Sequence, residues 1–65
     1  MRISRERLDI ALARKCLDVS GLSKMAKIPR STIDSAMNND GKVRTSTAGK
    51  IARALGVDVT EILAD

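Results

Sequence analysis

Residues 27–39 read KIPRSTIDSAMNN and include the chain's single proline, Pro29. Proline suits the first position of a helix, because its missing N–H would have no partner there, and it disfavours helical geometry in the residue before it. Apolar side chains then recur at helical spacing: Ile33, Ala36 and Met37. The sequence therefore predicts a helix over about residues 30–38 with one side packed inward. The other side presents Arg30, Ser31, Thr32, Asp34 and Ser35.

Two helices are predicted before this stretch. Ser4 can cap the first, which has apolar residues at i, i+3, i+4 and i+8 and ends near Leu17. Those residues are Leu8, Ala11, Leu12 and Cys16. Asp18 can cap the second, a short helix over about residues 19–25. Lys27 then falls in the turn that joins it to the next helix.

A fourth helix is predicted beyond a turn. Residues 38–42 read NNDGK, a set that favours turn conformations and ends the third helix. Thr45 or Ser46 can cap the fourth helix, and Gly56 can end it. Its expected buried residues are Ala48, Ile51, Ala52 and Leu55.

The chain closes with a fifth predicted helix. Asp58 can cap it, and Ile62 and Leu63 complete the core. No segment alternates between apolar and polar residues for long enough to predict a strand. We therefore expect an all-α fold, with residues 1–65 forming a single domain of five short helices.

The composition restricts the class of protein. The 65 residues include no aromatic side chain, and the proportions of 43% hydrophobic and 31% charged residues are typical of a soluble globular domain. The longest apolar run, residues 10–13, is too short to span a membrane, and the charged N-terminus does not resemble a signal peptide. With one cysteine, Cys16, and no histidine, we expect no intrachain disulfide, no metal site, no cofactor and a reducing, cytoplasmic location.

Positive charge is concentrated in the middle of the chain. The whole sequence carries a net charge of +4, whereas seven bases and two acids between Lys24 and Arg53 give that segment a net +5. Such a local excess suits a polyanion such as DNA or RNA, although a solvated basic surface gives the same pattern. RNA is the less favoured partner, because the chain lacks the aromatic side chains on which unpaired bases stack.

The order and spacing of these segments resemble a known family. LDVSGLSKMAKIPRSTIDSAMNN, residues 17–39, resembles the helix-turn-helix of the Cro and phage-repressor family, also called the xenobiotic-response-element family. AGKIARALGVDVTEIL, residues 48–63, is similar to its last two helices, and RLDIALARK, residues 7–15, to its first. The resemblance implies a lambda-repressor-like fold whose third helix enters the major groove of DNA, with its N-terminal residues nearest the bases.

Three residues depart from the usual pattern of that family. Val19 stands where the family usually has a glutamine that reaches a phosphate or braces the recognition helix, so we expect that contact to be absent. Lys27 occupies a turn position usually held by glycine, where a positive φ costs a lysine about 1 kcal/mol. Cys16 stands where a glycine often ends the first helix, so its thiol is expected near the surface, with an inert structural role or, alternatively, a role in redox sensing.

By family position, side chains on the third helix are implied to read bases. They are Arg30, Ser31, Thr32, Asp34 and Ser35. The planar guanidinium of Arg30 can bond both acceptors of a guanine, and a phosphate contact is its alternative. Asp34 can accept from cytosine or orient Arg30 as its i, i+4 partner. Thr32 carries a methyl group that can touch thymine, and Ser31 can instead bond its own backbone.

The resemblance also implies contacts with the DNA backbone around this helix. The candidates are Lys24, Lys27, Asn38, Asn39, Lys42 and Arg44, and the alternative for the lysines is a solvated surface. The expected function is that of a bacterial or phage-type transcriptional regulator, a repressor, bound to double-stranded DNA. Such proteins usually act as homodimers, here through Val57, Val59 and Ile62 or only once both copies are on DNA.

Other classes of function fit the sequence less well. With no histidine and a single cysteine, the chain offers no nucleophile with a paired base, so we expect no catalytic residue and no enzyme activity. The Gly-Lys pairs at residues 41–42 and 49–50 lack the flanking residues of a phosphate-binding loop. The main alternative is a protein-interaction module of the same fold, an antitoxin-like or regulatory partner whose basic face meets an acidic protein.

Overall fold

The computed structural model describes residues 1–38 and 42–64. Within these residues the chain forms four α-helices, one short 3-10 helix and two isolated β-bridges, without a strand. The elements are α1 (Arg5–Arg14), α2 (Val19–Ala26), α3 (Arg30–Asn38), α4 (Thr45–Leu55) and the 3-10 helix η1 (Val59–Glu61). The predicted all-α class is confirmed, and the fifth predicted helix is the three-residue η1.

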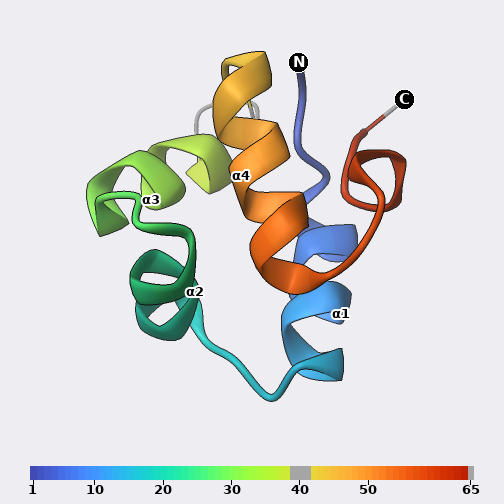
Figure 1. Cartoon of the computed structure of the whole chain (residues 1–65). Coiled ribbons are helices and arrows are strands. Elements are labelled where there is room, and N and C mark those ends of the chain that lie inside the picture. The colour runs from blue at the N-terminus through green and yellow to red at the C-terminus, as the bar shows by residue number, and fades with distance from the viewer. Residues whose placement is uncertain (39–41, 65) are drawn as a thin grey trace.

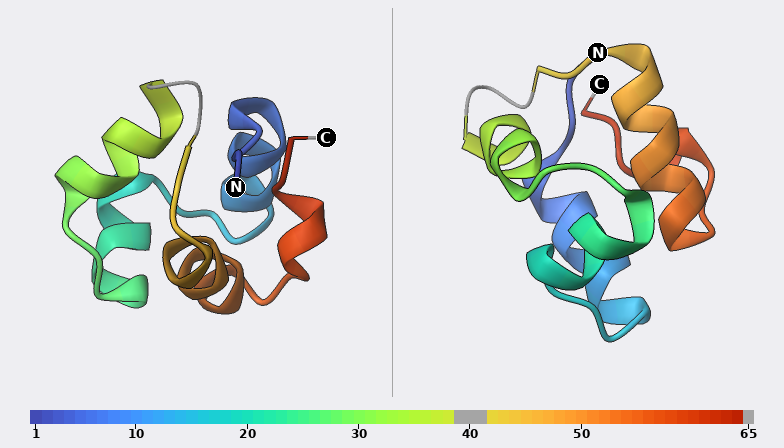
Figure 2. Two further views of the ribbon diagram at one scale, coloured as in Figure 1. Left: turned by 90° about the horizontal axis from the view of Figure 1, so that it is seen from above. Right: turned by 60° about the vertical axis from the view of Figure 1, so that its left-hand side comes forward.

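The elements are arranged around α4, which runs through the middle of the molecule (Figure 1). α2 and α3 lie together on one side of α4, and α1 and η1 lie on the other, as the view from above also shows (Figure 2). The core between them is aliphatic, and its largest fully buried side chains are Leu8, Leu22, Ile33, Ile51, Leu55 and Ile62. No polar side chain that the structure describes is buried, so the stability of this core comes from removing aliphatic surface from water.

The predicted inward faces of three helices are confirmed. The buried residues are Leu8, Ala11 and Leu12 in α1, Ile33 and Ala36 in α3, and Ala48, Ile51, Ala52 and Leu55 in α4. Ile62 is fully buried, whereas Leu63 and Met37 are partly buried at the edge of the core. Hydrophobic spacing alone was therefore sufficient to orient these helices.

Two helices begin at the side chains expected to cap them. The Ser4 hydroxyl accepts from the Arg7 N–H at 3.2 Å, and the Asp18 carboxylate accepts from the Gly21 N–H at 2.8 Å. Gly56 ends α4 as predicted, in the left-handed conformation with a φ of 67°. A β-carbon in that conformation costs an L-residue energy, which explains why glycine suits this position.

The predicted end of α1 and the predicted cap of α4 were wrong. α1 ends at Arg14, and not near Leu17, because the chain leaves helical geometry at the next residue and Cys16 adopts a left-handed φ of 54°. Cys16 is consequently exposed and does not continue the apolar side of α1. α4 is preceded by Arg44 in extended geometry without a side-chain cap, so neither Thr45 nor Ser46 has the predicted capping role.

The first residues of the chain tie two distant segments together. The Ser4 N–H donates to the Ile62 carbonyl at 2.8 Å, and the Val43 N–H donates to the Met1 carbonyl at 2.8 Å. Arg2 pairs with Lys42 in an isolated β-bridge. This N-terminal segment therefore fixes residues 42–44, just before α4, against the C-terminal end of the fold (Figures 1 and 2).

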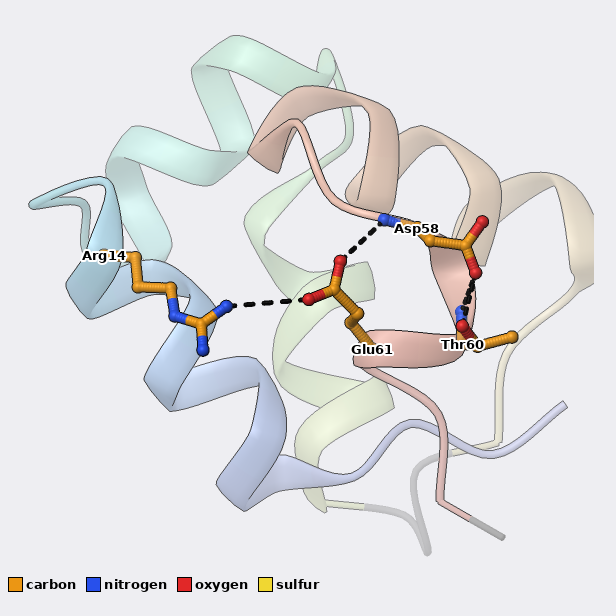
Figure 3. Close-up of polar contacts among 4 residues, drawn as sticks. All are labelled: Arg14, Asp58, Thr60 and Glu61. Atoms are coloured by element: carbon orange, nitrogen blue, oxygen red, sulfur yellow. Dashed lines mark hydrogen bonds and ion pairs between the residues drawn. The ribbon is translucent and has the colours of Figure 1, made fainter.

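The C-terminal turn is held by polar groups that satisfy one another (Figure 3). The Asp58 carboxylate accepts from the Thr60 hydroxyl and from the Thr60 N–H at 3.1 Å, and Glu61 accepts from the Asp58 N–H at 3.0 Å. The hydroxyl bond first, and then the backbone bond, lower the pKa of Asp58 below its ordinary value of 3.8. Glu61 also pairs with Arg14 across 3.6 Å, which links α1 to η1.

Candidate nucleic-acid interface

The turn between α2 and α3 has the geometry of a helix-turn-helix. Lys27 ends α2 in the left-handed conformation, with φ 56° and ψ 43°, as expected for the position at which the family usually has glycine. The Ser23 hydroxyl donates to the Ile28 carbonyl at 2.6 Å and so closes the turn. The Pro29 carbonyl then accepts from the Thr32 and Ile33 N–H groups, which starts α3. Proline is compatible with this start because its own N–H is not needed.

The outer side of α3 carries all five side chains that were predicted to read bases. Ile33 and Ala36 are buried and fix the rotation of the helix. Arg30, Ser31 and Ser35 are exposed, and Thr32 and Asp34 are half-buried. The exposed N-terminal turn of α3 is thus polar, carries a cation and can approach a surface closely.

Arg30 is held in place by two neighbours. Its Nη1 donates to the Ser20 hydroxyl at 3.1 Å, and its Nε lies 3.8 Å from a carboxylate oxygen of Asp34, one turn further along α3. The described residues offer no partner to Nη2, so this edge of the guanidinium remains available to an acceptor. Two fixed contacts reduce the rotamer freedom that the arginine would lose on binding.

Ser20 makes a contact that sequence reasoning missed. The family's glutamine position holds Val19, so no brace to α3 was expected from that residue. The structure places this brace one residue later, since the second residue of α2 bonds Arg30. No local sequence signal predicts the contact, because it joins residues ten apart in the sequence across the turn.

The segment before α4 brings further cations to the same edge. Lys42 and Arg44 are exposed and line an open groove of about 400 Å³, together with Thr32 and Ser35 of α3 and Thr47 of α4. Sequence reasoning missed Thr47 and Arg2 in this role. Arg2 pairs with Lys42 in the β-bridge, so the N-terminal segment adds a further basic residue beside Lys42 and Arg44.

The other residues that were predicted to contact the DNA backbone are spread over several parts of the chain. Asn38 is exposed at the end of α3, and Lys24 is exposed in the last turn of α2. Lys27 lines a different groove, between α2 and α4. Asn39 lies outside the residues that the structure describes.

The described part of the chain gives little support for other kinds of site. Within residues 1–38 and 42–64, no group of three or more His, Cys, Asp or Glu side chains could hold a metal ion. None of the helices in these ranges has the length and apolar character needed to cross a membrane. The polar edge of α3 is therefore the candidate site that combines exposure, positive charge and fixed side chains.

A short turn between two packed helices, with the second helix exposing its polar N-terminal side, defines the helix-turn-helix class of DNA-binding domain. The family model described as Cro/C1-type HTH DNA-binding domain matches residues 7–65. The chain belongs to this family, which consists of DNA-binding regulatory domains and is not a known family of enzymes. Comparison with curated proteins and comparison with solved structures gave no significant match.

Proposed function

We propose that residues 1–65 act as a single domain that binds double-stranded DNA at specific sequences and represses transcription by occupying its operator. In this proposal α3 enters the major groove. The observation that carries it is the position of Arg30, exposed at the first residue of α3 and held by Ser20 and Asp34. The B-DNA major groove is wide enough for an α-helix, and an arginine there can bond both acceptors of a guanine.

The side chains around Arg30 would supply the remaining readout. Ser31 and Thr32 follow it on the first turn of α3 and are short enough to reach base edges or phosphates only when the helix end sits close. Asp34 orients Arg30 and can accept from a cytosine amino group. Ser35 lies one turn beyond Ser31 on the exposed side, where it meets the edge of the footprint.

Phosphates would be bound on both sides of α3. Lys42 and Arg44, with Arg2 beside them, form a basic rim along one side of the recognition helix. Asn38, Asn39, Lys24 and Lys27 remain proposed contacts from the ends of the two helices. Phosphate contacts of this kind fix the register of the protein on the duplex and make its affinity depend steeply on salt.

Two copies of the domain would bind a two-fold operator about one helical turn apart, as is usual for regulators of this class. Ile62 does not offer apolar surface to a partner, because it is fully buried, and Val57 and Val59 are only partly exposed. We therefore place dimerisation on the DNA, in a bacterial or phage-type, cytoplasmic setting.

Selection of bound sites from a random pool of DNA duplexes tests the proposed function. We expect the full chain to recover one short recurring motif containing a guanine at a fixed position. Recovery of no motif, with binding equal for all duplexes, would contradict sequence-specific regulation. It would leave the second candidate, a protein-interaction module of the same fold, which is favoured by the basic groove that α2 and α4 form.

A further inference from the structure

A second basic surface lies between α2 and α4, away from the outer side of α3. An open groove of about 520 Å³ is lined by Met25, Ala26 and Lys27 from the C-terminal end of α2 and by Lys50, Arg53 and Ala54 from α4. We call it the α2–α4 groove. The two helices that form it pack side by side in the front of the molecule as drawn in Figure 1.

The α2–α4 groove combines apolar surface with unpaired positive charge. Met25 is 55% exposed, so much of its side chain contacts water without a protein neighbour. Lys27, Lys50 and Arg53 line the groove, and no acid does. Among the residues that the structure describes, none of these three cations forms an ion pair or a side-chain hydrogen bond.

The α2–α4 groove is separated from the proposed DNA edge along α4. The DNA edge includes Arg44, directly before the first residue of α4, whereas Arg53 lies in the last turn of that helix. At a rise of 1.5 Å per residue, the two positions are roughly 13 Å apart along the helix axis. Of the residues lining the groove, only Lys27 is also a proposed DNA contact. Lys50, Arg53 and Met25 are not among the proposed DNA contacts.

We propose that the α2–α4 groove binds an acidic, amphipathic segment of another protein. Carboxylates of the partner would pair with Lys50 and Arg53, and its apolar side chains would cover Met25 and Ala54. Methionine adapts its shape to different apolar partners, which suits such a groove. A nucleic acid fits less well, because its interfaces with proteins are mainly polar and the exposed thioether of Met25 cannot donate a hydrogen bond to a phosphate. The proposal does not depend on DNA binding, and it allows one molecule to hold a duplex and a protein partner together.

A peptide titration of the isotopically labelled full chain, followed by NMR, tests this proposal. The probe is a synthetic helical peptide with leucines along one side and glutamates around them. We expect saturable chemical-shift changes centred on Ala26, Lys27, Lys50, Arg53 and Ala54. The control peptide carries glutamine at every glutamate position, and we expect it to bind at least about tenfold more weakly.

Variants of the chain separate this groove from the DNA edge. We expect Met25→Ser and the double variant Lys50→Gln/Arg53→Gln each to weaken binding of the glutamate peptide about tenfold or more and to leave duplex affinity within about twofold. The matched double variant Lys42→Gln/Arg44→Gln should do the reverse. Thermal unfolding is measured for each variant, because Arg53 also interacts with the C-terminal dipole of α4.

Three results would overturn the proposal: no saturable binding of the glutamate peptide, equal binding of the glutamine peptide, or shift changes centred on Lys42, Arg44 and α3. In the last case the peptide acts as a general polyanion at the DNA edge. Each of these results is distinct from the failure of the proposed function, which is judged by duplex selection alone.

Discussion

Two ion pairs in different parts of the molecule have almost the same N···O distance and the same exposure to solvent. Arg14 lies 3.6 Å from Glu61, and Arg30 lies 3.8 Å from Asp34. The two arginine side chains are 65% and 64% exposed, and both carboxylates are 49% exposed. Exposed pairs of this kind contribute about 0–1 kcal/mol to stability, so the pairs themselves do not distinguish the two regions.

The neighbours of the two arginines do distinguish them. Glu61 also accepts from the Asp58 N–H, so the pair with Arg14 is part of the hydrogen-bonded cap that holds η1 (Figure 3). Arg30 instead stands at the open start of α3, braced by Ser20, with further cations along the same edge. Polar side chains that satisfy one another hold a fold together, whereas polar side chains held in place with unused donors prepare a binding surface.

The largest effects are expected from the core that supports both regions equally. Ile33 is on the inner side of α3 and Ile62 directly follows η1, and both are fully buried. We expect Ile33→Ala and Ile62→Ala each to lower the free energy of unfolding by about 2–5 kcal/mol, because each leaves a cavity. Urea denaturation of the two variants measures this loss. A loss below about 1 kcal/mol at either site would show that one region is not part of the common core.

The two arginines are expected to differ in DNA binding and not in stability. Arg30→Ala should weaken binding to the selected duplex by about 1–3 kcal/mol, with little effect on an unrelated duplex, because a base contact is lost. Arg14→Ala removes an equally exposed arginine and should leave duplex affinity unchanged. Fluorescence anisotropy at fixed salt measures both affinities. If the two variants bound alike, the difference in surroundings would have no functional meaning.

Lys42 and Arg44, the cations beside α3, are expected to bind phosphates of the DNA backbone. We expect Lys42→Gln and Arg44→Gln each to reduce the slope of log affinity against log salt by about one unit, because each removes a phosphate contact. Lys15, an exposed lysine at the end of α1, provides the matched control. Its replacement by glutamine should leave the slope as it is. An equal change for all three variants would indicate that only overall net charge matters.

Substitutions at two residues with positive φ, one in each region, are expected to change the free energy of unfolding in opposite directions. Lys27→Gly should raise the free energy of unfolding by about 0.5–1 kcal/mol, because glycine adopts the left-handed conformation without a steric penalty. Gly56→Ala should lower it by about 1 kcal/mol, since alanine would have to adopt a φ of 67°, which L-residues rarely adopt. Thermal unfolding at one pH compares them, and a shift of the same sign in both variants would contradict the assigned strain.

The smallest effect is expected from acid at the C-terminal cap. The pKa of Asp58 is lowered by its bonds with Thr60, so its charged form stabilises the fold at pH values above 3.8. That contribution is lost as the pH falls through the lowered pKa of the folded state. We expect the stability difference between the parent chain and Asp58→Asn to shrink below pH 3.8. A difference that stays constant down to pH 2, measured by urea denaturation, would show that the carboxylate charge has no part in the cap.

Local signals in the sequence were sufficient for much of this structure. Asp18 and Pro29 mark the starts of α2 and α3, and the spacing of apolar residues fixes the buried sides of α1, α3 and α4. The left-handed Lys27 was predictable because the family resemblance places a glycine-type turn there. The polar side of α3 follows directly from its buried side, since the two are opposite faces of one helix.

The parts that could not be predicted depend on contacts between distant residues. Arg2 joins the basic edge through a bridge to Lys42, forty positions away, and no short pattern encodes that pairing. The Ser20 brace depends on how the turn orients α2 against α3. α4 begins without a capping side chain, and Val43, two residues before it, is held by backbone bonds with Met1.

Replacement of single guanines by 7-deazaguanine in the selected duplex tests major-groove reading by Arg30 most directly. This change removes the N7 acceptor and keeps base pairing intact. We expect one guanine whose replacement weakens binding of the parent chain at least about fivefold, while Arg30→Ala binds the normal and the modified duplex equally. Equal sensitivity of the two proteins at every guanine, or no sensitive guanine at all, would contradict the assignment of Arg30 to a base in the groove.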